Sequence, residues 1–338
     1  MSFISYLVKR LITLVPVLFG VLTLTFILTK LMPGDPVAQL LGPQFTPEQY
    51  EQLYRQLGLH QPIMIQYFRY IADLFTGNWG TSVSIEPGER VWELIWQRYP
   101  RTIELALFSV IIASFLGVKT GLIASKHRNK WQDTTTRGIA LLGVSIPVFW
   151  LGMMAQYLFA YELDWLPAIG FKTPKYDDPV PITQFRMIDS LITGKVYLAI
   201  DYAIHLILPV SCLAFITLAS ITRQTRSSML EILQQDYIRT ARAKGCREKD
   251  VIHKHALKNA LIPTVTIIGL NFGGLLGGAI LTETTFGFKG VGAMLISAIR
   301  EHDYYLINAL VFFSALLFVL VNLSVDIIYG IIDPRIRY

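Results

Sequence analysis

The sequence is poor in charge and in cysteine for its length. Of its 338 residues only 16% are charged and only two are cysteines, whereas 53% are apolar, and the mean hydropathy is +0.46. Soluble domains carry about a quarter charged residues, so this composition is typical of a membrane protein. The two cysteines, Cys212 and Cys246, cannot build a disulfide framework.

Signatures of an enzyme or a nucleic-acid-binding protein are also missing. No Gly-x-x-x-x-Gly-Lys-Ser/Thr loop occurs, so nothing in the chain would cradle the phosphates of ATP. His253 and His255 are two residues apart, which directs them to different faces of a helix, a poor arrangement for a metal ion. Glu283 has no nucleophile–base pair beside it, and no basic tract is interleaved with aromatics. We therefore expect no catalysis, cofactor, metal site or nucleic-acid partner.

Long apolar runs dominate the rest of the sequence. A bilayer core needs about twenty apolar residues per helix. Six stretches reach that length: 11–31, 102–124, 138–161, 202–221, 261–281 and 306–331. The first is too long for a signal-peptide core and lacks a cleavage site after it, so we expect it to stay as an anchor. The predicted fold is an all-α membrane protein with six transmembrane helices.

Cations are distributed unevenly among the loops. The loops after the second and fourth stretches are basic, whereas the loop at 162–201 holds four cations against six acids. Because cytoplasmic loops carry the excess of Lys and Arg, we expect both termini and the basic loop 222–260 on the cytoplasmic side. The expected segments are the N-terminal end with the first helix, an extracytoplasmic insert, the core and a cytoplasmic tail, at 1–31, 32–101, 102–331 and 332–338.

The expected insert contains turn and helix signals. Pro33-Gly-Asp-Pro36 reads as a turn, and Thr46 followed by Pro47 predicts a helix with Thr46 as its N-cap. Two interpretations stay open. The insert is either a small lobe anchored by tryptophans at the membrane interface or part of a landing surface for an external binding protein.

The basic segment from Arg223 to Pro263 carries nine cations against four acids. Apolar residues recur three to four apart between Met229 and Ala241, which predicts one helix. Gly245 then suits a left-handed C-cap, and a second helical pattern runs towards Pro263. We call residues 237–249 the elbow. By composition alone the segment is only a topology signal that is attracted to anionic lipid.

Asp236-Tyr-Ile-Arg-Thr-Ala-Arg-Ala-Lys-Gly245 resembles the cytoplasmic coupling loop of ABC importer permeases, specifically of the dipeptide/oligopeptide permease family. The wider superfamily has a proline where this chain has Lys258, and the nearest proline is Pro263. The resemblance extends over the whole chain, through Met32–Pro36, Leu57-Gly-Leu59 with Pro62, Gly278–Phe286 and Asp333–Arg337.

The resemblance implies the type I ABC importer permease fold and a place in the cell membrane of a prokaryote. It also implies a heterodimer with a second, homologous permease subunit, two cytoplasmic ABC ATPases that hydrolyse ATP, and an extracytoplasmic solute-binding protein. The elbow would dock in a groove of the ATPase through Tyr237, Arg239, Thr240, Ala241, Arg242, Ala243, Lys244 and Gly245. We expect Arg239 and Arg242 to meet acceptors on the ATPase.

Glycines and prolines mark three of the predicted spans. The fifth span and its end hold glycines at close spacing: Gly269, Gly273, Gly274, Gly277 and Gly278. Such spacing lets helix backbones approach closely, so these glycines either pack within the bundle or face a partner subunit or the solute path. Pro147 and Pro209 are expected to kink the third and fourth spans.

The solute is not specified by these residues. Members of the family carry dipeptides or oligopeptides, and the alternatives are nickel complexes, glutathione or oligosaccharides. A secondary carrier that works without an ATPase is a rival interpretation. It is disfavoured because no predicted span carries the chain of buried carboxylates or histidines that proton coupling requires. A membrane scaffold without transport is a third possibility.

Overall fold

The computed structural model describes residues 3–32, 35–42 and 44–332. The Pro33-Gly34 part of the expected turn and residues 333–338 of the expected tail lie outside it. The described residues form helices only, apart from one isolated β-bridge between Thr81 and Arg90. Five helices are long and apolar enough to cross a membrane, and a bent pair makes a sixth crossing if it counts as one span.

The long helices carry the bundle. They are α1 (Phe3–Leu31), α5 (Val91–Lys126), α6 (Trp131–Ser145), α9 (Val196–Ile232), α12 (Leu257–Leu276) and α15 (Tyr304–Ile332). Shorter helices connect them. These are α2 (Pro36–Leu41), α3 (Pro47–Gln56), α4 (Ile63–Thr76), α7 (Val148–Gln156), α8 (Arg186–Ile192), α10 (Asp236–Ala243), α11 (Glu248–Asp250), α13 (Ile280–Thr285) and α14 (Val291–Arg300). Two π-helices, η1 (Tyr157–Glu162) and η2 (Val251–Ala256), continue α7 and α11.

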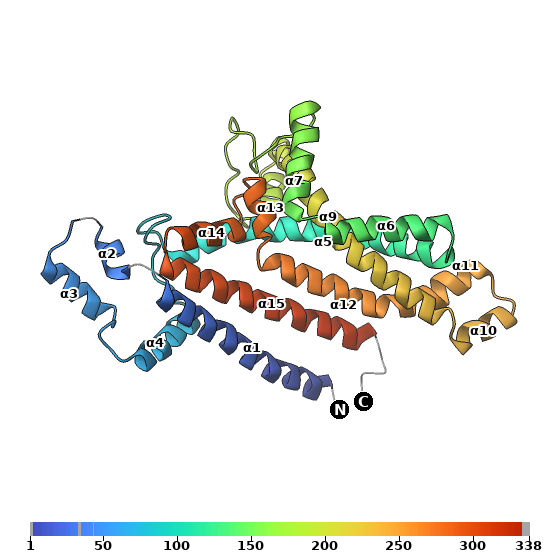
Figure 1. The fold of residues 1–338 in the computed structure, drawn as a ribbon, viewed down its shortest axis with the longest axis horizontal. Coiled ribbons are helices and arrows are strands. Elements are labelled where there is room, and N and C mark those ends of the chain that lie inside the picture. Colours follow the sequence, from blue (N-terminus) through green and yellow to red (C-terminus); the bar gives the residue numbers. More distant parts are fainter. Residues whose placement is uncertain (1–2, 33–34, 43, 333–338) are drawn as a thin grey trace.

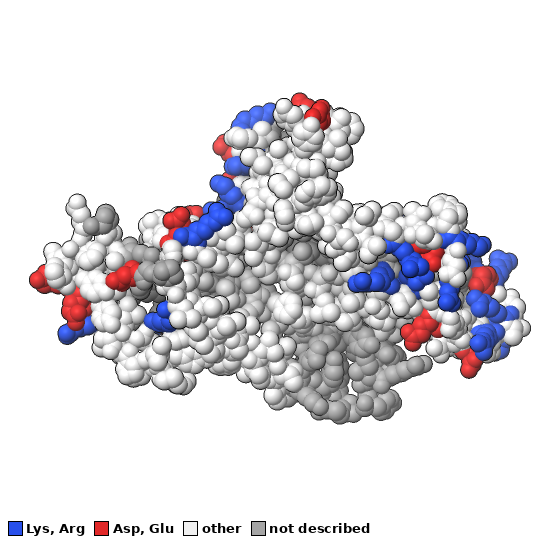
Figure 2. All heavy atoms as spheres, viewed as in Figure 1, with Lys and Arg blue, Asp and Glu red and all other residues white. Residues whose placement is uncertain are grey.

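The long helices run side by side, with α10 and α11 at one end and α2 to α4 at the other (Figure 1). The first turn of α1 and the last turn of α15 point towards the end that carries α10 (Figure 1). Charged side chains gather near the two ends and on the upper projection, and a mostly uncharged band lies between them (Figure 2). This distribution matches a bundle that crosses a bilayer.

The third predicted span is sharply bent. α6 and α7 meet at an angle of 100° at Ile146-Pro147, where a kink was predicted. Ile146 has extended backbone angles, φ −84° and ψ 125°, as expected for a residue before proline. Pro147 also has no N–H to continue the helix. In contrast, α9 continues through Pro209 as one helix.

Several predicted helix boundaries are wrong. The single helix expected from Met229 to Ala241 is broken, because α9 ends at Ile232 and α10 begins at Asp236 after the extended Gln235. The fifth span stops at Leu276 instead of reaching residue 281. Gly278, with φ +107°, turns the chain there, and an added Cβ would lie 2.9 Å from the Cα of Gly292. Helices α5 and α9 also begin earlier than expected, at Val91 and Val196.

The segment between the first two spans folds as three short helices. Thr46 and Gln49 form a reciprocal capping box at the start of α3, and Pro47 is the first helical residue, as the sequence predicted. The buried Asp303 at the start of α15 accepts hydrogen bonds from the Ser82 hydroxyl at 2.6 Å and from the Val83 amide at 2.9 Å. This carboxylate fastens the segment to the bundle.

Helices α5 and α9 bury two carboxylates and one histidine that the sequence alone did not single out. Glu104 of α5 is 4% exposed and accepts a hydrogen bond from the Met187 amide. Asp201 and His205 of α9 are also buried. Asp201 is held by the amide and hydroxyl of Thr173, and the His205 ring contacts the Asp201 carbonyl. Glu104 and Asp201 thus accept hydrogen bonds from the segment between η1 and α9, a role that an isolated sequence window cannot show.

Candidate functional site at the elbow

The elbow is fixed to the bundle by one apolar side chain of α10. Ile238 is fully buried, and it belongs to a cluster of buried apolar residues from α9, η2 and α12. The others are Met229, Val251, Ile252, Ala256 and Ala260. The helix is interrupted before Asp236, so its axis changes direction there. This change of direction lets Ile238 reach the cluster. Helix α10 is therefore anchored along one face and open along the rest.

The residues predicted from the sequence lie together on that open surface. Seven are exposed and Ala241 is half-buried; the exposed ones are Tyr237, Arg239, Thr240, Arg242, Ala243, Lys244 and Gly245. The hydroxyl of Tyr237 accepts a hydrogen bond of 2.9 Å from the Asn259 side chain, which ties α10 to α12. Charged side chains are dense at this end of the molecule (Figure 2).

Gly245 ends α10 in the predicted left-handed conformation, with φ +78°. The Gly245 amide donates to the Arg242 carbonyl at 3.0 Å, and the Cys246 amide donates to the Ala241 carbonyl at 3.2 Å. These two bonds form a Schellman motif, which satisfies carbonyls at the end of a helix. No atom lies within 4 Å of an added Cβ, so backbone conformation, not space, favours glycine here.

The two arginines of α10 differ in their surroundings. Arg242 donates two hydrogen bonds to Glu248, of 3.1 and 2.8 Å, and so bridges the Gly245 turn. These bonds raise the pKa of Arg242. Arg239 approaches only Asp236, at 3.4 Å, and both side chains are largely exposed. Arg239 is thus the freer of the two for a partner.

Sequence reasoning gave no role to Ile238, Glu248 or Asn259, although Ile238 is the one large aliphatic residue of α10.

The glycines of the fifth span separate into three environments. At Gly269 an added Cβ would lie 2.0 Å from Val325 of α15, and at Gly273 it would lie 3.2 Å from Phe318. Both glycines thus pack within the chain. Gly274 is exposed, and no atom lies within 4 Å of a Cβ added there. Gly277 and Gly278 lie at and after the C-terminal end of α12, outside the helix face expected from their spacing.

A second site of close packing joins α5, α13 and α14. Glu283 is fully buried; its carboxylate accepts hydrogen bonds from the Thr102 hydroxyl at 2.7 Å and from the Ala293 amide at 2.9 Å. A carboxylate at the first turn of a helix satisfies free amides and complements the helix dipole. Glu283 therefore has a structural role at the start of α14.

Within the described residues, no group of three or more His, Cys, Asp or Glu side chains could hold a metal ion. What the geometry supplies is an anchored helix, a turn of defined backbone conformation and a free cationic face.

Comparisons with known proteins place this arrangement in context. Residues 103–338 match the family model described as binding-protein-dependent transport system inner membrane component, and residues 3–106 match its N-terminal counterpart. The dipeptide transport system permease protein DppB of Alkalihalophilus pseudofirmus is 45% identical, covering 99% of this chain and 100% of that protein. The di/tripeptide transport system permease protein DppB of Pseudomonas aeruginosa is 42% identical over 99% of both chains.

A solved structure is similar in fold. The inward-facing MetNI methionine ABC transporter has a chain that superposes with a TM-score of 0.54 at 15% sequence identity. The match covers 72% of this chain and 97% of that chain. At this identity the likeness concerns the fold alone. It agrees with the predicted type I importer permease architecture.

Proposed function

Because the chain belongs to the family of binding-protein-dependent transport system inner membrane components, we infer that it is the permease subunit of an ABC importer for dipeptides or oligopeptides. It is a multi-pass protein of the cell membrane, and it works with an ATPase and a solute-binding protein. Its own helices supply the translocation path, and ATP hydrolysis takes place on the separate ATPase subunits.

The observation that carries this proposal is the elbow. α10 is fastened to three helical elements through the buried Ile238, so a force applied to α10 reaches the bundle. The exposed face with Arg239 remains open to a partner. Docked in a groove of the ATPase, α10 would convert closure of the nucleotide-binding subunits into movement of the spans. The bundle would then alternate between inward and outward access.

The assembly we propose contains a second, homologous permease subunit, two ATPases and the solute-binding protein. Both termini and the elbow lie on the cytoplasmic side, and the segment of α2 to α4 lies outside. The exposed Gly274 and the apolar surfaces of α6 and α7 are among the parts of the chain available to the second permease or to the solute path.

A gentle detergent extraction with this chain as bait tests the assembly. We expect mass identification to find an ABC ATPase pair and a second six-span permease. Uptake by proteoliposomes that hold this complex should require internal ATP, the binding protein and a dipeptide. A chain that is purified alone, and that takes up solute without ATP, would support the secondary carrier instead. Uptake of only nickel complexes, glutathione or oligosaccharides would change the solute and keep the importer.

A further inference from the structure

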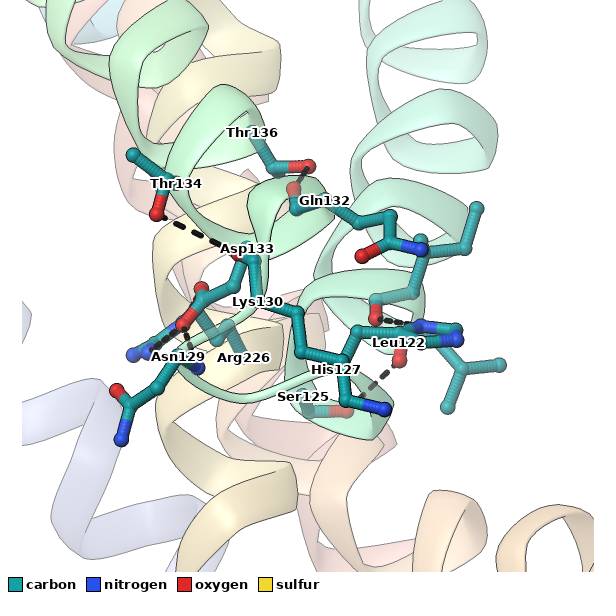
Figure 3. A network of polar contacts seen from close by, with 11 residues as sticks. Leu122, Ser125, His127, Asn129, Lys130, Gln132, Asp133, Thr134, Thr136 and Arg226 are labelled. Carbon is teal, nitrogen blue, oxygen red and sulfur yellow. Dashed lines mark hydrogen bonds and ion pairs between the residues drawn. The ribbon is translucent and has the colours of Figure 1, made fainter.

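Asp133 and Arg226 form a buried ion pair at the end of the bundle that carries the elbow. The Asp133 side chain is 1% exposed and that of Arg226 is 21% exposed. The guanidinium donates two hydrogen bonds to the carboxylate, of 2.6 Å from Nε and 2.8 Å from Nη2. The Asn129 amide, in the turn between α5 and α6, donates a third of 3.0 Å. In Figure 3, Arg226 of α9 and this turn both approach the carboxylate of Asp133 in α6.

The pair is one of few attachments of α6. Only Asp133 and Gly143 are buried in this helix. Gly143 also touches α9, since an added Cβ would lie 3.1 Å from Ala219 and 3.2 Å from the Phe215 carbonyl. The large apolar side chains of α6 are exposed, such as Leu141 at 68%, whereas Gln132, Thr136 and Ala140 are half-buried. The ion pair and the Gly143 contact, one near each end of α6, are thus the two places where a buried residue of α6 meets α9.

Helix α5 is joined to α9 more tightly. Added Cβ atoms at Gly117 and Gly121 would lie 2.8 Å from Ile221 and 2.7 Å from Thr225, so the two backbones are nearly in contact. Helix α6 lacks such a row of close backbone contacts with α9, and its first turn is joined to α9 by the carboxylate of Asp133. Arg226 lies in the last two turns of α9, just before the chain enters α10. The pair thus connects the base of the elbow directly to the bent helix pair.

We propose that Asp133 and Arg226 are positioning residues that make the first turn of α6 move with α9 when α10 is displaced. This inference rests on the proposed function, because it assumes that the elbow receives its movement from an ATPase. α9 is one continuous helix that ends at Ile232, shortly before α10, and the ion pair joins α6 to it. Without the pair, the first turn of α6 loses its charged attachment to α9, whereas α7 keeps its own packing against Leu208 and Cys212 of α9.

Paired substitutions in the assembled importer test this role. Asp133→Asn keeps the size of the side chain and one acceptor oxygen but removes the charge that holds Arg226. We expect uptake per ATP hydrolysed to fall roughly tenfold, as an interrupted coupling element would cause, while the complex still assembles and hydrolyses ATP. Asp133→Glu keeps the carboxylate and should retain most of the coupling. Lys130→Gln, an exposed charge in the same turn, should behave as the wild type.

The outcomes separate this inference from the function on which it rests. If the wild-type complex shows no uptake that depends on ATP and the binding protein, the proposed function fails. If the wild type transports and Asp133→Asn transports with an unchanged ratio to hydrolysis, the positioning role fails. It also fails if uptake and ATPase activity decline together with the amount of assembled complex, or if Asp133→Glu and Asp133→Asn lose coupling equally, because packing alone would explain either result.

Discussion

The role of the Gly245 backbone conformation can be tested by substitution, because an added Cβ would meet no steric clash. Its φ of +78° strains any residue with a side chain, although no atom lies within 4 Å of an added Cβ. The left-handed conformation costs an ordinary residue about 1–2 kcal/mol, and a β-branched residue suffers most. Gly245→Val should therefore distort the end of α10 and reduce uptake more than ATP hydrolysis, as measured in proteoliposomes with the complete importer.

Gly245→Asn is the matched control, because asparagine tolerates the left-handed region better than valine. We expect it to retain most of the uptake. Solute-stimulated ATPase activity and uptake that are both unchanged in Gly245→Val would show that the turn does not transmit movement.

Glu283 allows a second prediction, concerning stability. Replacing it by alanine leaves the Thr102 hydroxyl and the Ala293 amide without their acceptor. Each buried donor left unpaired costs about 1–3 kcal/mol, so Glu283→Ala should lower the thermal midpoint of the purified chain in detergent by several degrees. Glu301→Ala, at the exposed C-terminal end of α14, should change it little. Equal midpoints for the two variants would contradict the capping role.

The same carboxyl group should contribute to the pH dependence of stability. Burial raises the pKa of Glu283, against the opposing effect of its hydrogen bonds. The folded chain therefore holds this proton to a higher pH than the unfolded chain does. The resulting stabilisation is complete below the ordinary glutamate pKa and is lost as the pH rises through the raised value. Glu283→Gln is neutral at every pH, so thermal midpoints measured across this range should vary less than in the wild type.

Residues whose role depends on local backbone chemistry were predictable, and those whose role depends on distant partners were not. Thr46 and Gly245 act through amides and carbonyls within a few positions of themselves, so a short window contains the necessary information. Asp133 is bound by an arginine 93 positions away, and Asp303 by a loop more than 200 positions away. No periodicity in a single sequence reveals such partners.

Among whole elements, apolar length predicted the existence of the spans but not their ends. Helix α5 begins at Val91, before the apolar stretch, because a helix continues as long as its backbone bonds are made, whether or not lipid surrounds it. The break between α9 and α10 has no glycine or proline. It follows from the burial of Ile238 against η2, which is a tertiary effect. The bend at Pro147 was predictable in place, but its angle of 100° was not.

Two glycines of α12 give a prediction at this scale. An alanine at Gly269 would place its Cβ 2.0 Å from Val325 and force α12 and α15 apart, whereas Gly274 has open space around it. Overpacking of this kind costs about 1–3 kcal/mol. Gly269→Ala should therefore lower the thermal midpoint of the isolated chain, and Gly274→Ala should not. If both variants melt alike, close packing of α12 on α15 is not important for stability.

Gly274 can then be examined in the assembled importer. Gly274→Leu should leave the isolated chain stable, because nothing in the chain opposes the side chain. Loss of the second permease on purification would place Gly274 at the subunit interface. Loss of uptake in a complete complex would place it on the solute path.

For the molecule as a whole, the charge distribution and the course of the helices are consistent with the proposed orientation. The basic loops predicted a cytoplasmic elbow from the sequence, and α1 and α15 have their outer ends on the elbow's side of the bundle (Figure 1). Because α1 starts on the elbow's side, the insert that follows it lies at the opposite end of the bundle. What the sequence could not supply is how the helices divide into tightly and loosely joined groups. That division depends on glycine contacts such as Gly121 with Thr225.

The two cysteines provide a direct test of orientation and docking together. Cys246 is exposed, next to Gly245, whereas Cys212 is buried within α9. A membrane-impermeant maleimide should therefore label Cys246 in inside-out vesicles and leave it unlabelled in intact cells. Because an ATPase docked on α10 would cover this residue, stripping the ATPase from the vesicles should increase the labelling, and adding it back should reduce the labelling again.

Cys246→Ser should abolish the signal, and Cys212→Ser should leave it unchanged. Labelling from outside intact cells would reverse the assigned orientation. Labelling that is indifferent to the ATPase would move its docking surface away from the elbow.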